Sequence, residues 1–85
     1  MNYAVVFSYS FDYDVAVYLF KTFEEARSWL SKSLMAEYRI QTDENGWDAY
    51  YEVNGDGTYA KLVTQFFDHD DVMEIRLGCV YSAHG

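Results

Sequence analysis

The alternation of apolar and polar side chains predicts extended strands at the start of this chain. Between Asn2 and Tyr9, large apolar and aromatic residues occupy every second position, which is the period of a strand. Val15 to Phe20 is almost wholly apolar, and it predicts a second strand that is central and covered on at least one face. Ser10 to Asp14 carries turn acids, so the two strands are expected to form a hairpin.

One stretch, Thr22 to Tyr38, has the period of a helix instead. Its apolar residues recur at spacings of three and four, so they form one stripe along the helix, namely Phe23, Ala26, Leu30, Leu34 and Tyr38. Thr22 is the expected N-cap, and Glu25 completes a Thr-x-x-Glu capping box. A helix with a single apolar stripe is expected to pack on one face of a sheet.

Three more strands are predicted after the helix, and they lie at Trp47 to Val53, Thr58 to Phe67 and Val72 to Tyr81. Turns are expected between these segments, at Asp43 to Gly46, Asn54 to Gly57 and Asp68 to Asp71. Arg39 to Thr42 is either a frayed helix end or a short extended piece. The last residues, 81–85, are expected to form a loose tail.

The predicted order is therefore β-β-α-β-β-β, an α+β fold in a single domain over residues 1–85. We expect a mainly antiparallel sheet of about five strands, with one helix packed on one face. The other face is expected to be partly open, and it can bind a partner or a second copy of the chain. In the last strand, alternate residues are expected to point inward, namely Met73, Ile75, Leu77, Cys79 and Tyr81. Cys79 is therefore expected to be a buried structural thiol.

Composition narrows the functional classes. No apolar run reaches the ~18 residues of a membrane span, and the N-terminus lacks the pattern of a signal peptide. The single cysteine favours a reducing, cytoplasmic setting. Neither a nucleophile elbow, a phosphate-binding glycine loop nor a dinucleotide fingerprint is present, so we expect no catalytic residues, no cofactor and no enzyme activity.

Charge is the strongest functional signal, because the formal net charge is -8 at pH 7. Residues 43–74 contain nine acids and one base, Lys61, whereas residues 1–42 are almost balanced. Direct binding to nucleic acid or to anionic membranes is disfavoured, since phosphates are contacted by Lys and Arg. A basic protein partner is favoured. The alternative is that the negative charge only maintains solubility.

The predicted partner-binding residues are these nine acids together with two tyrosines, namely Asp43, Glu44, Asp48, Glu52, Asp56, Asp68, Asp70, Asp71, Glu74, Tyr50 and Tyr59. Alternate residues of a strand lie about 6.6 Å apart, close to the ~6.8 Å rise of two base steps. In this character residues 43–74 resemble the nucleic-acid mimics that phages and mobile elements use against host defence, anti-CRISPR proteins among them, and also acidic nuclease inhibitors. The resemblance implies that the carboxylates occlude a basic nucleic-acid channel, with tyrosines as anchors.

Two other functions remain open. The first is an acidic housekeeping interaction module that acts as a homodimer through the open sheet face. The second is a metal-dependent enzyme at Asp68 to Asp71, where His69 and the carboxylates offer suitable ligands. A charged turn is the favoured interpretation of that cluster, because the spacing of a calcium-binding loop is missing.

Overall fold

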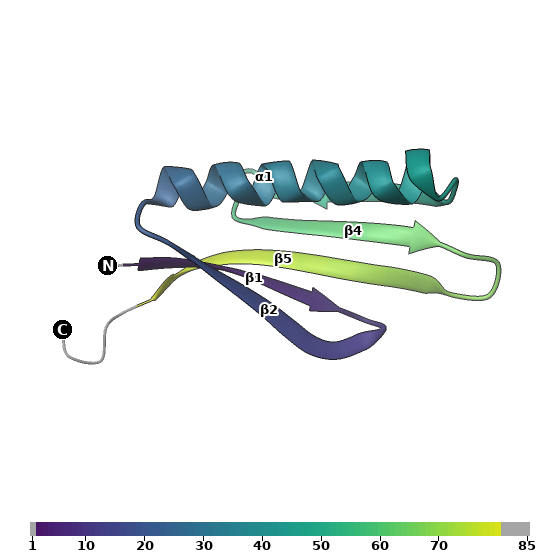
Figure 1. The fold of residues 1–85 in the computed structure, drawn as a ribbon, viewed down its shortest axis with the longest axis horizontal. Helices are drawn as coiled ribbons and strands as arrows, with labels where there is room; N and C mark the ends of the chain where they lie inside the picture. Colours follow the sequence, from purple (N-terminus) through teal and green to yellow (C-terminus); the bar gives the residue numbers. More distant parts are fainter. Residues whose placement is uncertain (1, 81–85) are drawn as a thin grey trace.

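The computed structural model describes residues 2–80, except for the side chains at positions 12 and 13. Its elements follow the order β-β-α-β-β-β, which confirms the predicted α+β class (Figure 1). Their bounds are β1 Asn2–Tyr9, β2 Asp12–Phe20, α1 Phe23–Arg39, η1 Ile40–Glu44, β3 Asp48–Val53, β4 Tyr59–Gln65 and β5 Asp70–Val80. The predicted tail, 81–85, lies outside the described residues.

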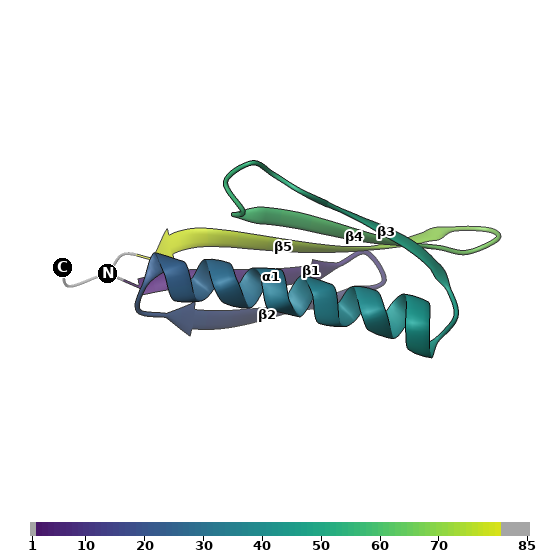
Figure 2. The ribbon, with the colours of Figure 1, turned by 90° about the horizontal axis from the view of Figure 1, so that it is seen from above.

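The five strands form one antiparallel sheet in the order β2-β1-β5-β4-β3. Strand β5 lies in the middle, where it joins the β1–β2 hairpin to the β3–β4 hairpin (Figure 2). Helix α1 runs along one face of this sheet, and no described helix covers the other face, which we call the open face (Figure 1). The register aligns Phe7, Ile75 and Ala60 in one row beneath the helix.

The hydrophobic core lies between α1 and the sheet. Its buried side chains come from the helix stripe and from alternate strand positions, and they are Val5, Phe7, Ala26, Leu30, Leu34, Ala60, Leu62, Met73 and Ile75. Trp29 extends the core over β2, where its ring centroid lies 4.5 Å from that of Tyr18. The apolar stripe predicted for the helix therefore does face the sheet.

Both ends of α1 are set by local hydrogen bonds. At the start, the Glu25 amide donates to the Thr22 hydroxyl at 3.1 Å, which confirms the predicted N-cap. At the other end the chain neither frays nor becomes extended, because it continues from Arg39 into the wider π-helical turn η1. The Thr42 hydroxyl donates to the Tyr38 carbonyl at 2.9 Å within this turn.

The prediction that the second strand is central is wrong. β2 is an edge strand, because β1 is its one neighbour in the described sheet. The helix-facing side of β2 is partly covered by Trp29, but Val15, Val17 and Leu19 on the open face are 55%, 56% and 62% exposed. An apolar run shows that a strand is apolar on both faces and does not show what covers each face.

Cys79 is exposed, so the prediction of a buried thiol is also wrong. It shares a face with the core residues, since it lies opposite Tyr3. However, the pairing of β5 with β4 ends at Arg76, so residues beyond Arg76 have a strand neighbour on one side only. The alternation is confirmed at Met73 and Ile75, and Tyr81 lies outside the described residues.

The observed bounds of the strands differ from the predicted ones by a few residues. β2 begins at Asp12 and β5 at Asp70, so the β1–β2 and β4–β5 turns are shorter than predicted. The predicted turn at Asn54 to Gly57 is present, with Gly57 at φ 71 and the Asn54 side chain accepting from two backbone amides. Within residues 2–80, no helix has the length and apolar character needed to cross a membrane.

Candidate partner-binding surface

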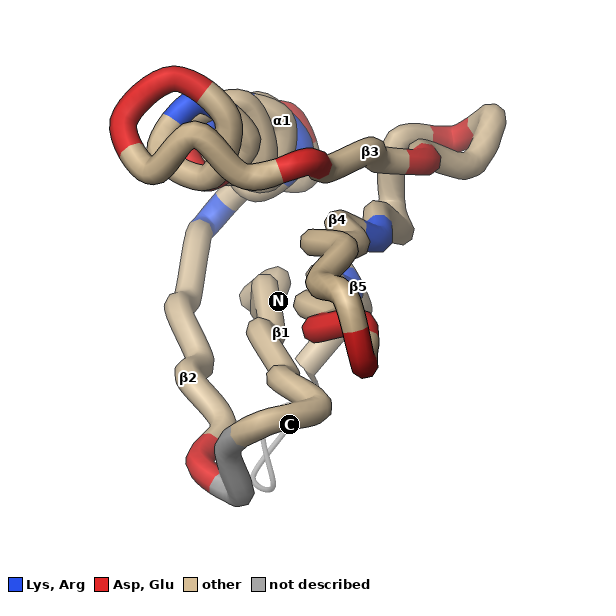
Figure 3. Tube along the Cα trace, turned by 90° about the vertical axis from the view of Figure 1, so that its right-hand side faces the viewer, with Lys and Arg blue, Asp and Glu red and all other residues tan. Residues whose placement is uncertain are grey.

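Six of the predicted acids lie together at one end of the molecule, which we call the acidic end. They are Asp43, Glu44, Asp48, Asp68, Asp70 and Asp71. Figure 3 looks at this end, where both the connection from η1 to β3 and the β4–β5 turn lie. Gly46 makes that connection possible, because it adopts φ 71, a conformation that glycine accepts without strain.

His69 ties the carboxylates of the β4–β5 turn together. Its Nδ1 lies 2.7 Å from the Asp68 carboxylate, and its Nε2 lies 3.5 Å from that of Asp71. The hydrogen bond to Asp68 raises the pKa of His69 and lowers the pKa of Asp68. The imidazole also stacks on Phe66, whose ring contacts Trp47 at 5.0 Å between centroids. The turn is therefore attached to the start of β3 through aromatic contacts.

The remaining predicted acids lie elsewhere, and two of them have cationic neighbours. On the open face, the register aligns Glu52, Lys61 and Glu74 in one row across β3, β4 and β5. Lys61 lies 4.0 Å from Glu52, and Arg76 lies 2.9 Å from Glu74. The middle of the open face is thus close to neutral, and the uncompensated negative charge lies toward the acidic end.

Tyr50 and Tyr59, the two predicted anchors, both lie on the open face but in different environments. Tyr50 is exposed on β3. Tyr59 is partly buried, and its hydroxyl donates to Glu74 at 2.5 Å while Arg76 lies over its ring. This hydrogen bond to a carboxylate raises the pKa of Tyr59. Tyr50 is therefore free to contact a partner, whereas Tyr59 already belongs to an internal network.

Asp56 is the predicted acid that lies farthest from this site. It belongs to the β3–β4 turn, at the opposite end of β3 from Asp48. The structure therefore brings together six of the nine acids, places Glu52 and Glu74 on the adjoining sheet face, and separates Asp56 from the rest.

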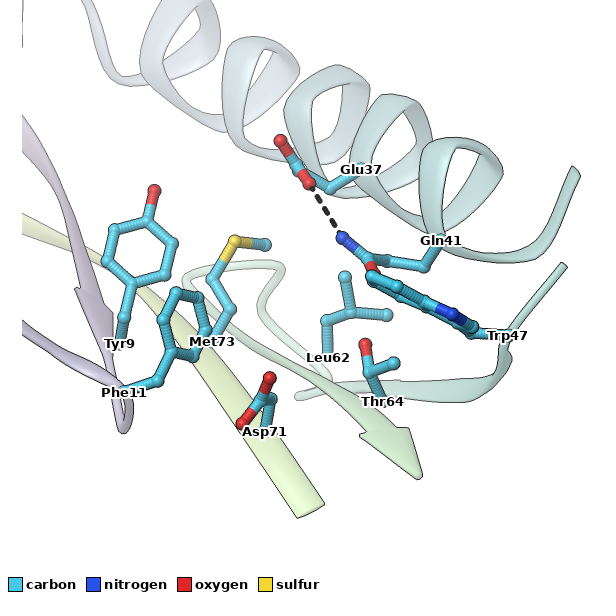
Figure 4. Close-up of a pocket in the computed structure, with 9 residues that line it drawn as sticks. All are labelled: Tyr9, Phe11, Glu37, Gln41, Trp47, Leu62, Thr64, Asp71 and Met73. Carbon is cyan, nitrogen blue, oxygen red and sulfur yellow. Dashed lines mark hydrogen bonds between the residues drawn. The ribbon is translucent and has the colours of Figure 1, made fainter. Parts of the chain in front are cut away.

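A cavity of about 300 Å³ opens at the acidic end, between the last turns of α1 and the sheet (Figure 4). Nine residues from seven segments line it, and they are Tyr9, Phe11, Glu37, Gln41, Trp47, Leu62, Thr64, Asp71 and Met73. Among these only Asp71 was predicted as a site residue. Sequence reasoning missed the others because nothing local to any one segment shows that they converge.

The metal-site alternative gains no support from the geometry. Among residues 2–80, no group of three or more His, Cys, Asp or Glu side chains is arranged to hold a metal ion. At the Asp68 to Asp71 turn, Nδ1 of the imidazole is hydrogen-bonded to Asp68, and Nε2 lies 3.5 Å from the Asp71 carboxylate. The favoured interpretation of this cluster as a charged turn agrees with these contacts.

Comparisons with known proteins add no functional assignment. No protein-family model matches the chain, and neither a curated protein nor a solved structure matches it at a significant level.

Proposed function

We propose that this protein is a stoichiometric inhibitor that covers the basic, nucleic-acid-binding site of another protein with its acidic end. The observation that carries the proposal is the clustering of six carboxylates at one end of a protein with a net charge of -8. A surface of one sign attracts an oppositely charged partner and aligns it during encounter. A site built to hold phosphates offers the Lys and Arg side chains that such a surface requires.

The spacing of the carboxylates supports the same proposal. Asp48 and Asp70 both lie opposite Gln65 on the open face, so they are two strand spacings apart, or about 9.6 Å. Along β3, Asp48 and Glu52 are separated by about 13 Å, which is close to the ~13.6 Å rise of four base steps. The separation of Asp48 and Glu52 along β3 thus resembles a phosphate spacing along one strand.

The kind of target follows from the resemblance to phage and mobile-element inhibitors. The partner we propose is a host defence effector that binds nucleic acid in a Lys- and Arg-lined channel, such as a CRISPR effector or a nuclease. Occupying that channel blocks its nucleic acid without any chemical step by the inhibitor. Exposed Tyr50, next to Asp48 and Glu52 on β3, supplies apolar contact area beside the charges.

The test compares capture by three immobilised proteins from a bacterial lysate, at low and then raised salt. The variant Asp48→Lys/Asp70→Lys reverses two charges at the acidic end. The control Glu24→Lys/Asp56→Lys makes the same change in total charge at the other end, where α1 begins and β3 ends. Proteins retained by wild type and control, lost by the test variant and eluted by salt are identified by mass spectrometry.

The captured protein is then assayed for nucleic-acid binding with increasing amounts of the inhibitor. We expect a basic nucleic-acid-binding enzyme whose binding is lost at about one equivalent. Equal capture by both variants contradicts the proposal, and so does a captured protein that still binds its nucleic acid at full occupancy.

The homodimer alternative keeps one specific observation in its favour, which is the exposed apolar row of β2. Val15, Val17 and Leu19 are each more than half exposed, and β1 is the only neighbour of this strand in the sheet. A second copy that pairs with the same edge in an antiparallel, two-fold arrangement satisfies the edge amides and carbonyls and brings the two apolar rows side by side on the open face. Such a dimer leaves both acidic ends uncovered.

A further inference from the structure

The cavity at the acidic end has walls of two kinds. The aromatic rings of Tyr9, Phe11 and Trp47 line it together with the apolar side chains of Leu62 and Met73 (Figure 4). Polar groups enter from two sides, because Glu37 and Gln41 belong to the helical segment while Thr64 and Asp71 belong to the sheet. The lining contains two carboxylates and no Lys, Arg or His. An apolar wall combined with negative charge is suited to an organic cation.

Thr64 gives a second and independent indication that the cavity binds a polar ligand. This residue is only 5% exposed, and its hydroxyl is directed into the cavity (Figure 4). None of the described residues forms a side-chain hydrogen bond with that hydroxyl. Among the described residues, no fully buried side-chain oxygen lacks a hydrogen-bond partner. Since the Thr64 hydroxyl has no such partner, its oxygen must be accessible from the cavity. A buried hydroxyl in an apolar wall is costly unless a ligand or water satisfies it.

The polar groups of the lining are mainly hydrogen-bond acceptors. Gln41 donates its amide nitrogen to Glu37 at 3.5 Å, which leaves the Gln41 carbonyl oxygen as an acceptor. Together with the carboxylates of Glu37 and Asp71 and the Thr64 hydroxyl, this oxygen forms a set of acceptors on both sides of the cavity. The ligand that complements such a set carries several donors and a positive charge.

We propose that this cavity receives the guanidinium group of one arginine side chain from the basic partner. The inference rests on the proposed function, because that function supplies the arginine. Guanidinium is planar, carries five N–H donors and stacks on aromatic rings, so it matches both the acceptors and the rings. A volume of about 300 Å³ is at the lower limit of small-molecule pockets, which suits one side chain rather than a larger ligand.

Arginine is preferred over lysine for a geometric reason. The acceptors enter from α1 and from the sheet, on opposite sides of the cavity. A forked guanidinium donates in several directions at once, whereas a lysine ammonium is a compact and strongly hydrated point charge. The aromatic walls also favour the more weakly hydrated cation.

The test uses N-acetyl-arginine amide as the probe, added to the isotope-labelled full chain and followed by heteronuclear NMR. N-acetyl-citrulline amide is the matched neutral probe, since it replaces guanidinium by a urea of nearly the same shape. N-acetyl-lysine amide tests the preference among cations. We expect the arginine probe to shift the Trp47 indole N–H and the Thr64 amide at millimolar concentrations, and the other two probes to bind about tenfold more weakly or less.

The variant Glu37→Gln/Asp71→Asn removes both carboxylates from the cavity, and Glu24→Gln/Asp56→Asn removes the same charge elsewhere. Affinity for the arginine probe should fall about tenfold or more in the first variant and stay unchanged in the second. Trp47→Ala, which leaves the charges in place, should weaken it as well. Each variant's amide spectrum verifies that it folds.

Three results overturn the inference: equal binding of the citrulline probe, shifts spread over the acidic end without Trp47, or full affinity in Glu37→Gln/Asp71→Asn. None of them affects the proposed function if Asp48→Lys/Asp70→Lys still abolishes capture, because Asp48 and Asp70 do not line the cavity. Conversely, the arginine probe could bind the cavity while Asp48→Lys/Asp70→Lys leaves capture of the partner unchanged. That combination refutes the proposed function alone.

Discussion

At the scale of single residues, one imidazole contributes to the charge of the acidic end. His69 lies between Asp68 and Asp71, and each of these contacts favours its protonated form. Protonation offsets part of the negative charge that we propose the partner recognises. The acidic residues could be identified directly from the sequence, but the sequence does not show how their environments differ. Glu52 pairs with Lys61 on the neighbouring strand, which depends on cross-strand register and was not predictable from local pattern, whereas Glu74 pairs with Arg76 two residues along the same strand.

The first prediction concerns the titration of His69. We expect its pKa to lie above the ordinary value of 6.5 and to return toward it in Asp68→Asn. Because the folded-state pKa of His69 is raised, its stabilising effect is complete below 6.5 and is lost as pH rises through the folded value. The pKa of Asp68 is lowered from 3.8, so the stabilising effect of Asp68 is complete above pH 3.8 and is lost as pH falls through the folded-state pKa.

NMR of the His69 ring protons across pH 4 to 9 measures this pKa directly. Asp56→Asn is the control, since it removes an equal charge at the far end and should leave the titration unchanged. A wild-type pKa at or below 6.5, or no decrease in Asp68→Asn, contradicts the contact between His69 and Asp68 in solution.

At the scale of elements, the helix was the easiest part to predict and the strand edges were the hardest. Thr22, the apolar stripe and the charges of α1 all favour the same structure, so local pattern and tertiary packing agree. By contrast, nothing within Val15 to Phe20 distinguishes a central strand from an edge strand. The sheet order depends on which strand pairs with β5, and that choice is made by segments far apart in the chain.

The second prediction concerns how strongly α1 is held on the sheet. Leu30 is 1% exposed at the centre of the core, so Leu30→Ala should lower the free energy of unfolding by about 2–5 kcal/mol through lost burial and a cavity. Chemical denaturation followed by circular dichroism measures the change. Ser31→Ala, at the next and exposed position, should change stability by no more than about 0.5 kcal/mol. Similar losses in both variants would show that Leu30 does not pack against the sheet.

At the scale of the whole molecule, charge and apolar surface are separated. The acidic end lies where α1 finishes, whereas the exposed apolar row lies along β2, at the edge of the sheet. A dimer through β2 and an inhibitor that uses its acidic end are therefore compatible in space. In an antiparallel pairing of two β2 strands, the two acidic ends point in opposite directions, so the assembly presents two separate partner sites.

The third prediction tests this pairing. If β2 forms a dimer, wild-type protein should increase in mass with concentration from 10.0 kDa toward twice that value, with little dependence on salt. Val17→Lys places a charge in the middle of the apolar row and should keep the protein monomeric, whereas Ser28→Lys on the exposed side of α1 should not. Sedimentation velocity over a wide concentration range measures the mass. A wild type that is monomeric throughout, or a Val17→Lys dimer, excludes an interface at β2.

The central position of β5 affects when the chain can fold during its synthesis. β5 is the last described strand along the chain, and both hairpins need it as their common neighbour. While the ribosome is still making residues 70–80, β1, β2 and α1 have emerged without the strand that completes their sheet. Their apolar side chains stay solvent-accessible until these distant segments meet, which is the slow step for sheets with long-range pairing. Folding of this sheet therefore waits until β5 has emerged, and the excess negative charge helps to keep the waiting chains apart.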